Sequence, residues 1–168
     1  MRAALAYVAR LSMLNDNMME SALPTISPVQ GTLHACDPQQ LPWLPWAMKG
    51  AYFKLLSADP DSGRFALMIK LDEGCRTPAH RHVGAVEGIV LEGGFHYADA
   101  PHVRYTAGTY LLEDAGAIHQ PVSPEGALMF AVFHGPVEGL DRDGNTVARL
   151  DCQWHVDTWR AGIAAPPT

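Results

Sequence analysis

The sequence lacks the features that would place it in a membrane, on a nucleic acid or in a disulfide framework. No apolar run approaches the ~20 residues needed to span a bilayer. The 168 residues include 12 Lys and Arg against 18 Asp and Glu, and the basic residues are scattered, which disfavours nucleic-acid binding. The three cysteines, Cys36, Cys75 and Cys152, include no short-spaced pair, so neither a disulfide framework nor a cysteine zinc site is expected. We therefore expect a cytoplasmic protein without membrane or nucleic-acid partners.

The length and composition predict one globular domain with appendages. Hydrophobic residues make up 48% of the chain and charged residues 18%, which is typical of a folded domain. We predict an N-terminal extension or arm over residues 1–40, a β domain over 41–150 and a C-terminal tail over 151–168 that contains a short helical turn. Five prolines between Pro24 and Pro45 favour an extended arm, and we expect Trp43 and Trp46 to dock it onto the core.

The domain itself is predicted to be all-β, as a sandwich or barrel. Short apolar runs alternate with turn residues from Ala51 onward, and no ten-residue helical period interrupts them before Leu150. The expected strands cover residues 52–56, 65–71, 86–91, 95–97, 103–105, 109–112, 118–122 and 127–133. Asp143-Gly144 predicts a hairpin turn near the end of the domain.

Three histidines and one glutamate form a candidate metal site. His80 and His82 are two residues apart, so on a strand both imidazoles point to one face. Glu87 follows five residues later, and His119 comes after a glycine-bearing turn. Three neutral imidazoles and a carboxylate suit a divalent transition ion such as iron, manganese, nickel, zinc or copper. An isolated His-x-His is more often two exposed histidines, so the metal-site prediction depends on the spacing of the surrounding glycines.

Those glycines give the chain its resemblance to the cupins. Gly74, five residues, His80-x-His82, four residues, Glu87, six residues and Gly94 together resemble the complete first cupin motif. Gly108, five residues, Asp114-x-Gly116, two residues, His119, three residues and Ser123 resemble the second motif. Asp114 and Ser123 stand where that motif usually has proline and asparagine, and neither position is that of a ligand.

The resemblance implies a cupin jelly-roll barrel over residues 41–150, with His80, His82, Glu87 and His119 as metal ligands. Within the superfamily, His80-Arg81-His82, the Trp-Leu-Pro arm and Gly-Thr-Tyr at 108–110 resemble cupins grouped with 2,4'-dihydroxyacetophenone dioxygenase. The chain resembles acetylacetone-cleaving dioxygenases more distantly. The cupin half of ChrR-type anti-sigma factors also resembles residues 74–119.

The function implied by this resemblance is Fe(II)-dependent cleavage, with O₂, of a carbon–carbon bond in a small aromatic hydroxyketone or β-diketone. Zn, Mn or Ni remain alternatives to Fe(II), and no catalytic residue separate from the ligands is assigned. Two other functions stay open: a non-catalytic metal sensor of the ChrR type and a redox-neutral Zn or Mn isomerase. We expect a homodimer or larger homo-oligomer formed through sheet edges and the arm.

Several further side chains have two interpretations. Tyr97, Met129 and Phe133 can line a pocket or simply pack in the core. His134, at the end of the strand at 127–133, can face the pocket mouth, although a hydrogen-bonded histidine at a sheet edge is the preferred interpretation.

Overall fold

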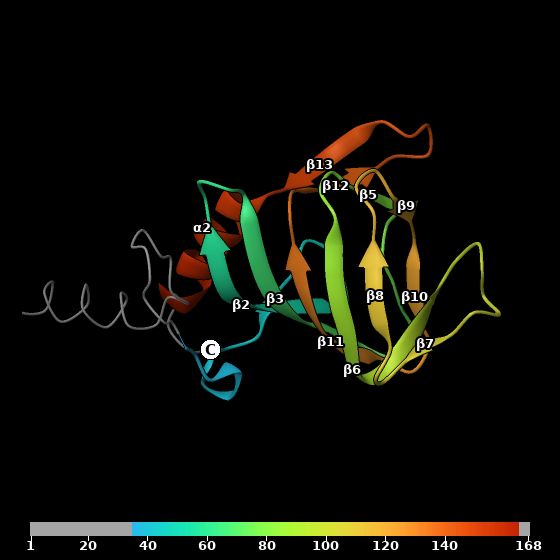
Figure 1. Ribbon diagram of the computed structural model, residues 1–168, viewed down its shortest axis with the longest axis horizontal. Coiled ribbons are helices and arrows are strands. Elements are labelled where there is room, and N and C mark those ends of the chain that lie inside the picture. Colours follow the sequence, from blue (N-terminus) through green and yellow to red (C-terminus); the bar gives the residue numbers. More distant parts are fainter. Residues whose placement is uncertain (1–34, 165–168) are drawn as a thin grey trace, which may run out of the picture.

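The computed structural model describes residues 35–164. Most of the predicted N-terminal arm therefore lies outside the described residues. The described part contains one 3₁₀ turn, thirteen strands and one helix (Figure 1). Their bounds are η1 Pro38–Gln40, β1 Leu44–Pro45, β2 Ala51–Asp59, β3 Arg64–Leu71, β4 Cys75–Arg76, β5 His80–His82, β6 Val86–Tyr97, β7 Tyr105–Thr106, β8 Tyr110–Glu113, β9 Ile118–His119, β10 Pro121–Ser123, β11 Ala127–Phe133, β12 Val137–Leu140, β13 Thr146–Leu150 and α2 Cys152–Ala164.

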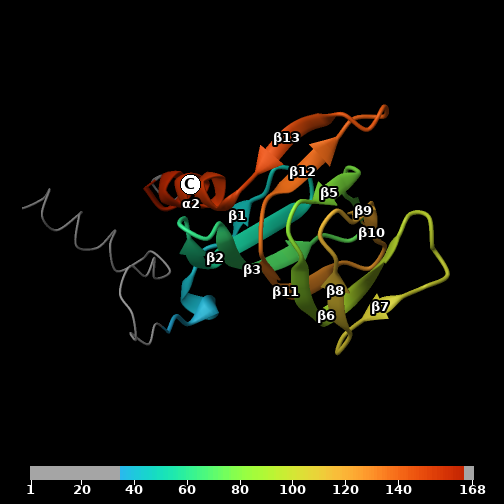
Figure 2. The same ribbon diagram turned by 45° about the horizontal axis from the view of Figure 1, so that its top comes forward.

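The strands form two antiparallel sheets. The larger sheet has the order β1-β2-β3-β11-β6-β10-β4, with β7 and β8 also pairing with β6. The smaller sheet has the order β13-β12-β5-β9. Figure 2 shows this smaller sheet along one side of the curled larger sheet. The all-β class predicted from the punctuated apolar runs is confirmed, and the hairpin at Asp143-Gly144 joins β12 to β13.

Strand β6 is longer than the sequence predicts. The residues Glu92-Gly93-Gly94 were expected to end one strand and begin another, but β6 runs through them from Val86 to Tyr97. The pairing of β6 with β11 shifts register here, as a β-bulge does, and Gly93 has φ +63°. A Cβ atom at Gly93 would lie 2.1 Å from the carbonyl oxygen of Gly126, so only glycine fits. The bulge bends the strand instead of ending it.

The C-terminal tail also differs from the prediction, since it forms a 13-residue helix rather than a short turn. Asp151 begins the helix, because its carboxylate accepts a hydrogen bond of 2.9 Å from the backbone N–H of Trp154. The buried residues of α2 recur at helical spacing and pack toward β2; they are Cys152, His155, Val156 and Trp159. This spacing was present in the sequence but was interrupted by polar residues.

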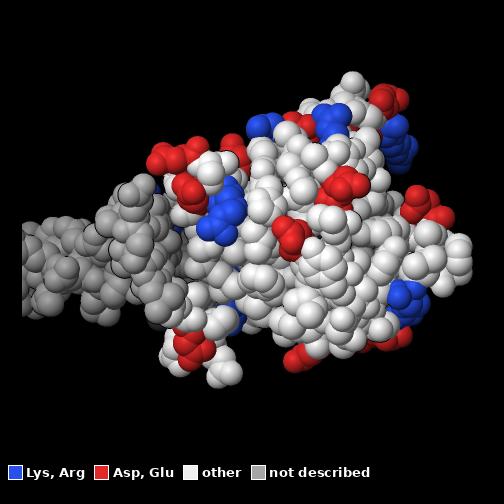
Figure 3. Space-filling model, viewed as in Figure 1, with Lys and Arg blue, Asp and Glu red and all other residues white. Residues whose placement is uncertain are grey.

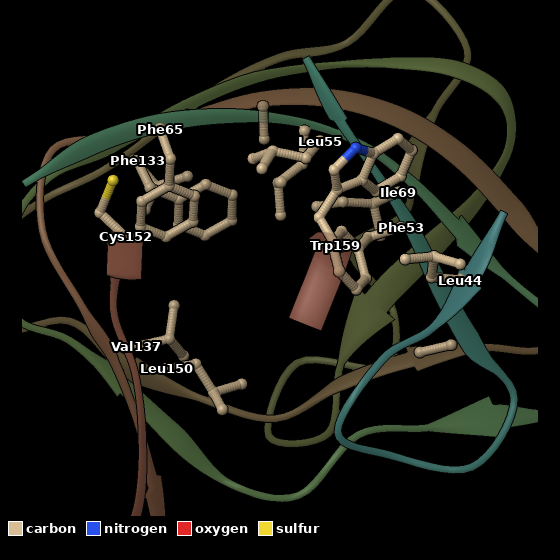
Figure 4. Close-up of a cluster of buried hydrophobic side chains, with 14 of the residues drawn as sticks. Leu44, Phe53, Leu55, Phe65, Ile69, Phe133, Val137, Leu150, Cys152 and Trp159 are labelled. Carbon is tan, nitrogen blue, oxygen red and sulfur yellow. The ribbon is translucent and has the colours of Figure 1, made fainter. Parts of the chain in front are cut away.

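The hydrophobic core joins α2 to the larger sheet (Figure 4). Phe53, Phe65 and Trp159 are completely buried, and Phe65 stacks on Phe133 with ring centroids 4.8 Å apart. Trp46 packs against this core, as expected of an arm residue. No helix in residues 35–164 has the length and apolar character needed to cross a membrane. The core thus fills one end of the molecule and leaves the strands bearing the histidines at the other.

Candidate metal centre

Two short strands bring the three predicted histidines together. On β5, His80 and His82 point to one side, and antiparallel pairing with β9 places His119 directly opposite His80. The turn before β9 is tied to β5 by two backbone hydrogen bonds, Gly116 N–H to His82 O at 2.7 Å and His82 N–H to Ala117 O at 3.0 Å. Gly116 has φ +87°, which this turn requires. The motif glycine therefore fixes the position of His119 relative to His82.

The outward side of β5 is held by a charged network. Arg81, between the two histidines, pairs with the carboxylate of Glu138 on β12, and Arg149 donates a hydrogen bond of 2.8 Å to the same carboxylate. Only 12% of the Glu138 side chain is exposed. Because this network fixes Arg81 on the outside, the alternation along β5 keeps both histidines on the inside.

The ring nitrogens converge as metal ligands do. The Nε2 atom of His119 lies 2.9 Å from the Nε2 atoms of both His82 and His80. All three ligand atoms lie within 4.8 Å of one another. Two nitrogens that bind one ion at about 2.1 Å in neighbouring positions at a right angle are about 3.0 Å apart, whereas a tetrahedral angle separates them by about 3.4 Å. The two spacings that His119 makes fit neighbouring ligand positions of a six-coordinate ion.

The protonation of the rings also suits an ion. His80 donates from Nδ1 to the carbonyl oxygen of Pro78 at 3.0 Å, which leaves its Nε2 lone pair free. Burial lowers the pKa of His80 to about 4, and the nearby His119 adds to the shift. Burial also lowers the pKa of His119, although Glu113 opposes this. Both rings are therefore neutral at pH 7, as metal ligands must be.

The carboxylate beside the histidines belongs to Glu113, at the end of β8. One of its oxygens, Oε2, lies 3.1 Å from His82 Nε2, and the other, Oε1, lies 3.4 Å from His119 Nδ1. The Tyr97 hydroxyl donates to Oε1, and the Tyr97 ring stacks on His119 with centroids 4.6 Å apart. Burial opposes ionisation of Glu113, but its hydrogen bonds with His82 and Tyr97 and the electrostatic effect of the nearby imidazoles prevail and lower its pKa. Glu113 lies outside the group of side chains that could hold an ion together, and its position beside Nδ1 suits it to orient His119.

Glu87, predicted as the fourth ligand, is not brought to the histidines, and this expectation is corrected. Side chains alternate along β6, so Val86 and Gly88 face inward while Glu87 faces out. The Glu87 carboxylate accepts a hydrogen bond of 2.9 Å from the Tyr110 hydroxyl and lies 3.2 Å from His134 Nε2 on the outer face. Val86 lines the inner cavity at the position where the motif spacing was expected to place a ligand.

A cavity of about 140 Å³ opens beside the three histidines. Apart from the histidines and Glu113, its only polar side chain is Thr77, and no Lys or Arg is among the described residues that line it. Met129 and Phe133 line the cavity, which was one of the two interpretations given for them. Tyr97 is not among the lining residues and contacts Glu113 and His119 instead. Burial raises the pKa of Tyr97, with the charge of Glu113 adding to the shift, so its hydroxyl remains a donor.

Two residues near the histidines, Glu113 and Trp46, were not indicated by the sequence motifs. Glu113 could have been found by extending the expected strand at 109–112 by one residue, because Leu111 and Glu113 then share a face away from exposed Tyr110. Trp46 was assigned to packing alone, yet it lines the cavity as well. At Ser123, the departure from the second motif is accommodated by a hydrogen bond of 2.8 Å from its buried hydroxyl to the carbonyl oxygen of Gly94.

Comparisons with known proteins agree with this architecture. A sequence profile described as the ChrR Cupin-like domain matches residues 32–138. A comparison with curated proteins finds no match. Among solved structures, an RmlC-like cupin protein from Ralstonia eutropha is 25% identical, with 80% of this chain and 92% of that chain covered and a TM-score of 0.71. An acetylacetone dioxygenase from Acinetobacter johnsonii is 19% identical, with 82% and 96% covered and a TM-score of 0.69.

Proposed function

Because this chain belongs to the ChrR Cupin-like domain family, a branch of the cupins, we propose that it is a metal-dependent cupin dioxygenase. The reaction we propose is cleavage of a carbon–carbon bond in a small aromatic hydroxyketone or β-diketone, with Fe(II) as the metal. The observation that carries the proposal is the convergence of three imidazole Nε2 atoms on one wall of a mostly apolar cavity. The activity named for the Acinetobacter johnsonii protein is of this kind, and at 19% identity its likeness supports the fold alone.

The reaction balances without an external reductant. One oxygen atom of O₂ is added to each carbon of the bond that breaks. A β-diketone then yields a carboxylic acid and a dicarbonyl compound, and an aryl hydroxymethyl ketone yields an aryl carboxylic acid and formic acid. An Fe(II) ion held by His80, His82 and His119 would supply the Lewis acidity and the redox chemistry.

The side chains of the cavity would position the substrate and accept the proton that it loses on binding. A diketone or hydroxyketone binds a metal best as an enolate or alkoxide, so one proton must leave. The Oε2 atom of Glu113 stands beside His82 and is ionised, so it can accept that proton, while the Tyr97 hydroxyl stabilises the carboxylate through Oε1. The apolar walls exclude water from the substrate. A reducing, cytoplasmic setting is part of the proposal, and Cys36, Cys75 and Cys152 are all unpaired.

The test is anaerobic loading with Fe(II), followed by metal analysis and oxygen-electrode traces on aryl hydroxyketones and β-diketones. We expect one iron per chain and O₂ uptake that depends on substrate. The His119→Ala variant should lose both. The matched control is His134→Ala, which removes a histidine from the outer face and should retain both.

Two alternative functions would be recognised by the same measurement. Tight zinc binding with no turnover would favour a non-catalytic regulatory module, which the ChrR family description keeps as the second candidate. Turnover without O₂ consumption would favour a redox-neutral Zn or Mn enzyme. Either result would overturn the dioxygenase proposal.

A further inference from the structure

Trp46 is one of three aromatic residues that line the cavity, together with Phe95 and Phe133. The segment of residues 46–48, between β1 and β2, lines the same cavity as the three histidines. The Trp46 ring meets Phe133 edge to face, with centroids 6.5 Å apart and planes at 82°. Phe133 in turn lies 6.0 Å from the His82 ring. Two aromatic contacts therefore connect the ligand-bearing strand to Trp46 along one wall.

The indole of Trp46 is held in one orientation by a buried histidine from α2. Trp46 Nε1–H donates to His155 Nε2 at 3.2 Å. His155 carries its own proton on Nδ1, which donates to the carbonyl oxygen of Asp151 at 2.7 Å, so Nε2 is free to accept. The His155 ring is fully buried and stacks on Phe65 with centroids 4.3 Å apart. The partly buried Trp46 ring also packs against Phe53, with centroids 6.4 Å apart, so both rings of the pair contact neighbouring aromatic rings.

The size and polarity of the cavity restrict what it can hold. An apolar cavity of about 150 Å³ in another protein is known to accept benzene, which makes about 140 Å³ enough for roughly one ring. Glu113 is the one carboxylate in the described lining and no cation faces it there, so an anionic group entering the cavity would meet repulsion and lose its hydration. An uncharged ligand with a single polar end meets neither cost.

We propose that Trp46 is the residue that determines substrate size, and that His155 is its positioning residue. The ligand class is an uncharged diketone or hydroxyketone whose oxygens lie at the three-histidine end and whose apolar part, no larger than about one ring, extends toward Trp46. This inference rests on the proposed function, because it takes the three-histidine cluster as the end that binds the ligand's oxygens.

The size limit is tested by equilibrium binding to the Zn(II)-loaded protein, which measures affinity without turnover. The ligands are pentane-2,4-dione, 1-phenylbutane-1,3-dione and 1,3-diphenylpropane-1,3-dione, titrated by calorimetry. The wild type should bind the two-ring diketone at least about 100-fold more weakly than the one-ring diketone. Trp46→Ala should reduce the ratio of the one-ring to the two-ring affinity at least tenfold. The control Trp43→Ala removes an indole that contacts the Lys54 ammonium and does not line the cavity, so it should leave the affinity ratio unchanged.

The positioning role is tested at both ends of the hydrogen bond. His155→Leu and Trp46→Phe each remove it, and both should narrow the size gap while Zn(II) affinity stays at the wild-type value. His155→Gln keeps an acceptor and should retain most of the discrimination. If a folded His155→Leu and Trp46→Phe lose only thermal stability and keep the full size gap, the positioning role is wrong. If His155→Leu does not fold, His155→Phe takes its place, because it keeps an aromatic ring on Phe65 but offers no acceptor to Trp46 Nε1–H.

The charge restriction is tested with a matched pair of ligands. In 2,4-dioxopentanoate a carboxylate replaces one methyl group of pentane-2,4-dione, and we expect at least 100-fold weaker binding of the anion. Equal binding of the two ligands, or a size gap that Trp46→Ala does not change, would overturn the inference. Failure of the wild type to bind any of the diketones would overturn both proposals. Selective binding without O₂ uptake in the Fe(II) protein would overturn the dioxygenase proposal alone.

Discussion

At the scale of single residues, the glutamate beside the histidines is Glu113 and not Glu87, which the motif predicts. Glu87 has the motif spacing but lies on the outer face, hydrogen-bonded to Tyr110 and near His134. Glu113 was not singled out by the motif, yet its two oxygens approach His82 and His119. The side chain that points inward is decided by the alternation of the strand, and a shift of one residue moves a ligand to the opposite face.

We expect Glu113→Gln to weaken metal binding about 10- to 100-fold, since that is the usual effect of removing a carboxylate that contacts a ligating histidine. Glu87→Gln should bind metal like the wild type. Competition with a chromophoric chelator measures both affinities. Metal loss in Glu87→Gln with normal binding in Glu113→Gln would restore the motif assignment.

At the scale of elements, α2 is joined to the arm and to the sheet by His155. This ring accepts from Trp46, donates to the backbone of Asp151 and stacks on Phe65. Burial lowers its pKa to about 4, with the Asp151 carbonyl and carboxylate opposing the shift. The folded chain therefore holds His155 neutral at pH values where the unfolded chain protonates it.

This difference predicts a loss of stability in acid. Well above pH 6.5, the pKa of the unfolded chain, His155 is neutral in both states and its contribution to the free energy of unfolding is complete. Below that pH the unfolded chain binds a proton, whereas the folded chain does not until the pH approaches 4. For His155 the loss between pH 7.5 and pH 5 is about 2 kcal/mol. Urea unfolding of the metal-free protein at both pH values should show a smaller drop for His155→Gln than for the wild type. Equal drops would mean that His155 is not the responsible group.

At the scale of the whole molecule, the larger sheet carries apolar side chains on both faces over β11, β6 and β8, and the Glu87 carboxylate lies among those of the outer face. The inner face packs in the core, whereas the outer face exposes apolar side chains, with Tyr110 at 60% and Leu112 at 58%, and with Ile89 and Leu91 beside them. Figure 3 shows this front of the molecule as a broad surface with few charged residues. A solvated antiparallel face is normally polar, so this one is suited to burial.

We propose that a second copy of the chain covers this face, in keeping with the homo-oligomer expected from the sequence. Strands of a sheet can pack on the same strands of a twofold-related copy, which makes the face self-complementary. Light scattering at micromolar concentration should give a dimer or larger species for the wild type and a monomer for Leu112→Glu. The control Val147→Glu changes another exposed apolar residue, on β13, and should not alter the mass. A monomeric wild type would rule out the oligomer.

Much of the fold and most of the histidine cluster could be predicted from the sequence. Short apolar runs separated by turn residues are a local signal, so the all-β class and the hairpin at Asp143-Gly144 followed directly. The spacing of His80 and His82 is also local, because the alternation of a strand puts residues two apart on one face. The family motifs then linked His119 to them across the chain.

The tertiary structure alone decided which side chains complete the site. Whether Val86 or Glu87 faces inward depends on the pairing of β6 with β8 and β11, and the role of Glu113 depends on where β8 ends relative to β5 and β9. Trp46 meets His155 at a distance of 109 residues along the chain, across the core. Residue identity and local periodicity are written in the sequence, but register and contacts between distant segments arise only when the strands pair and the helix packs.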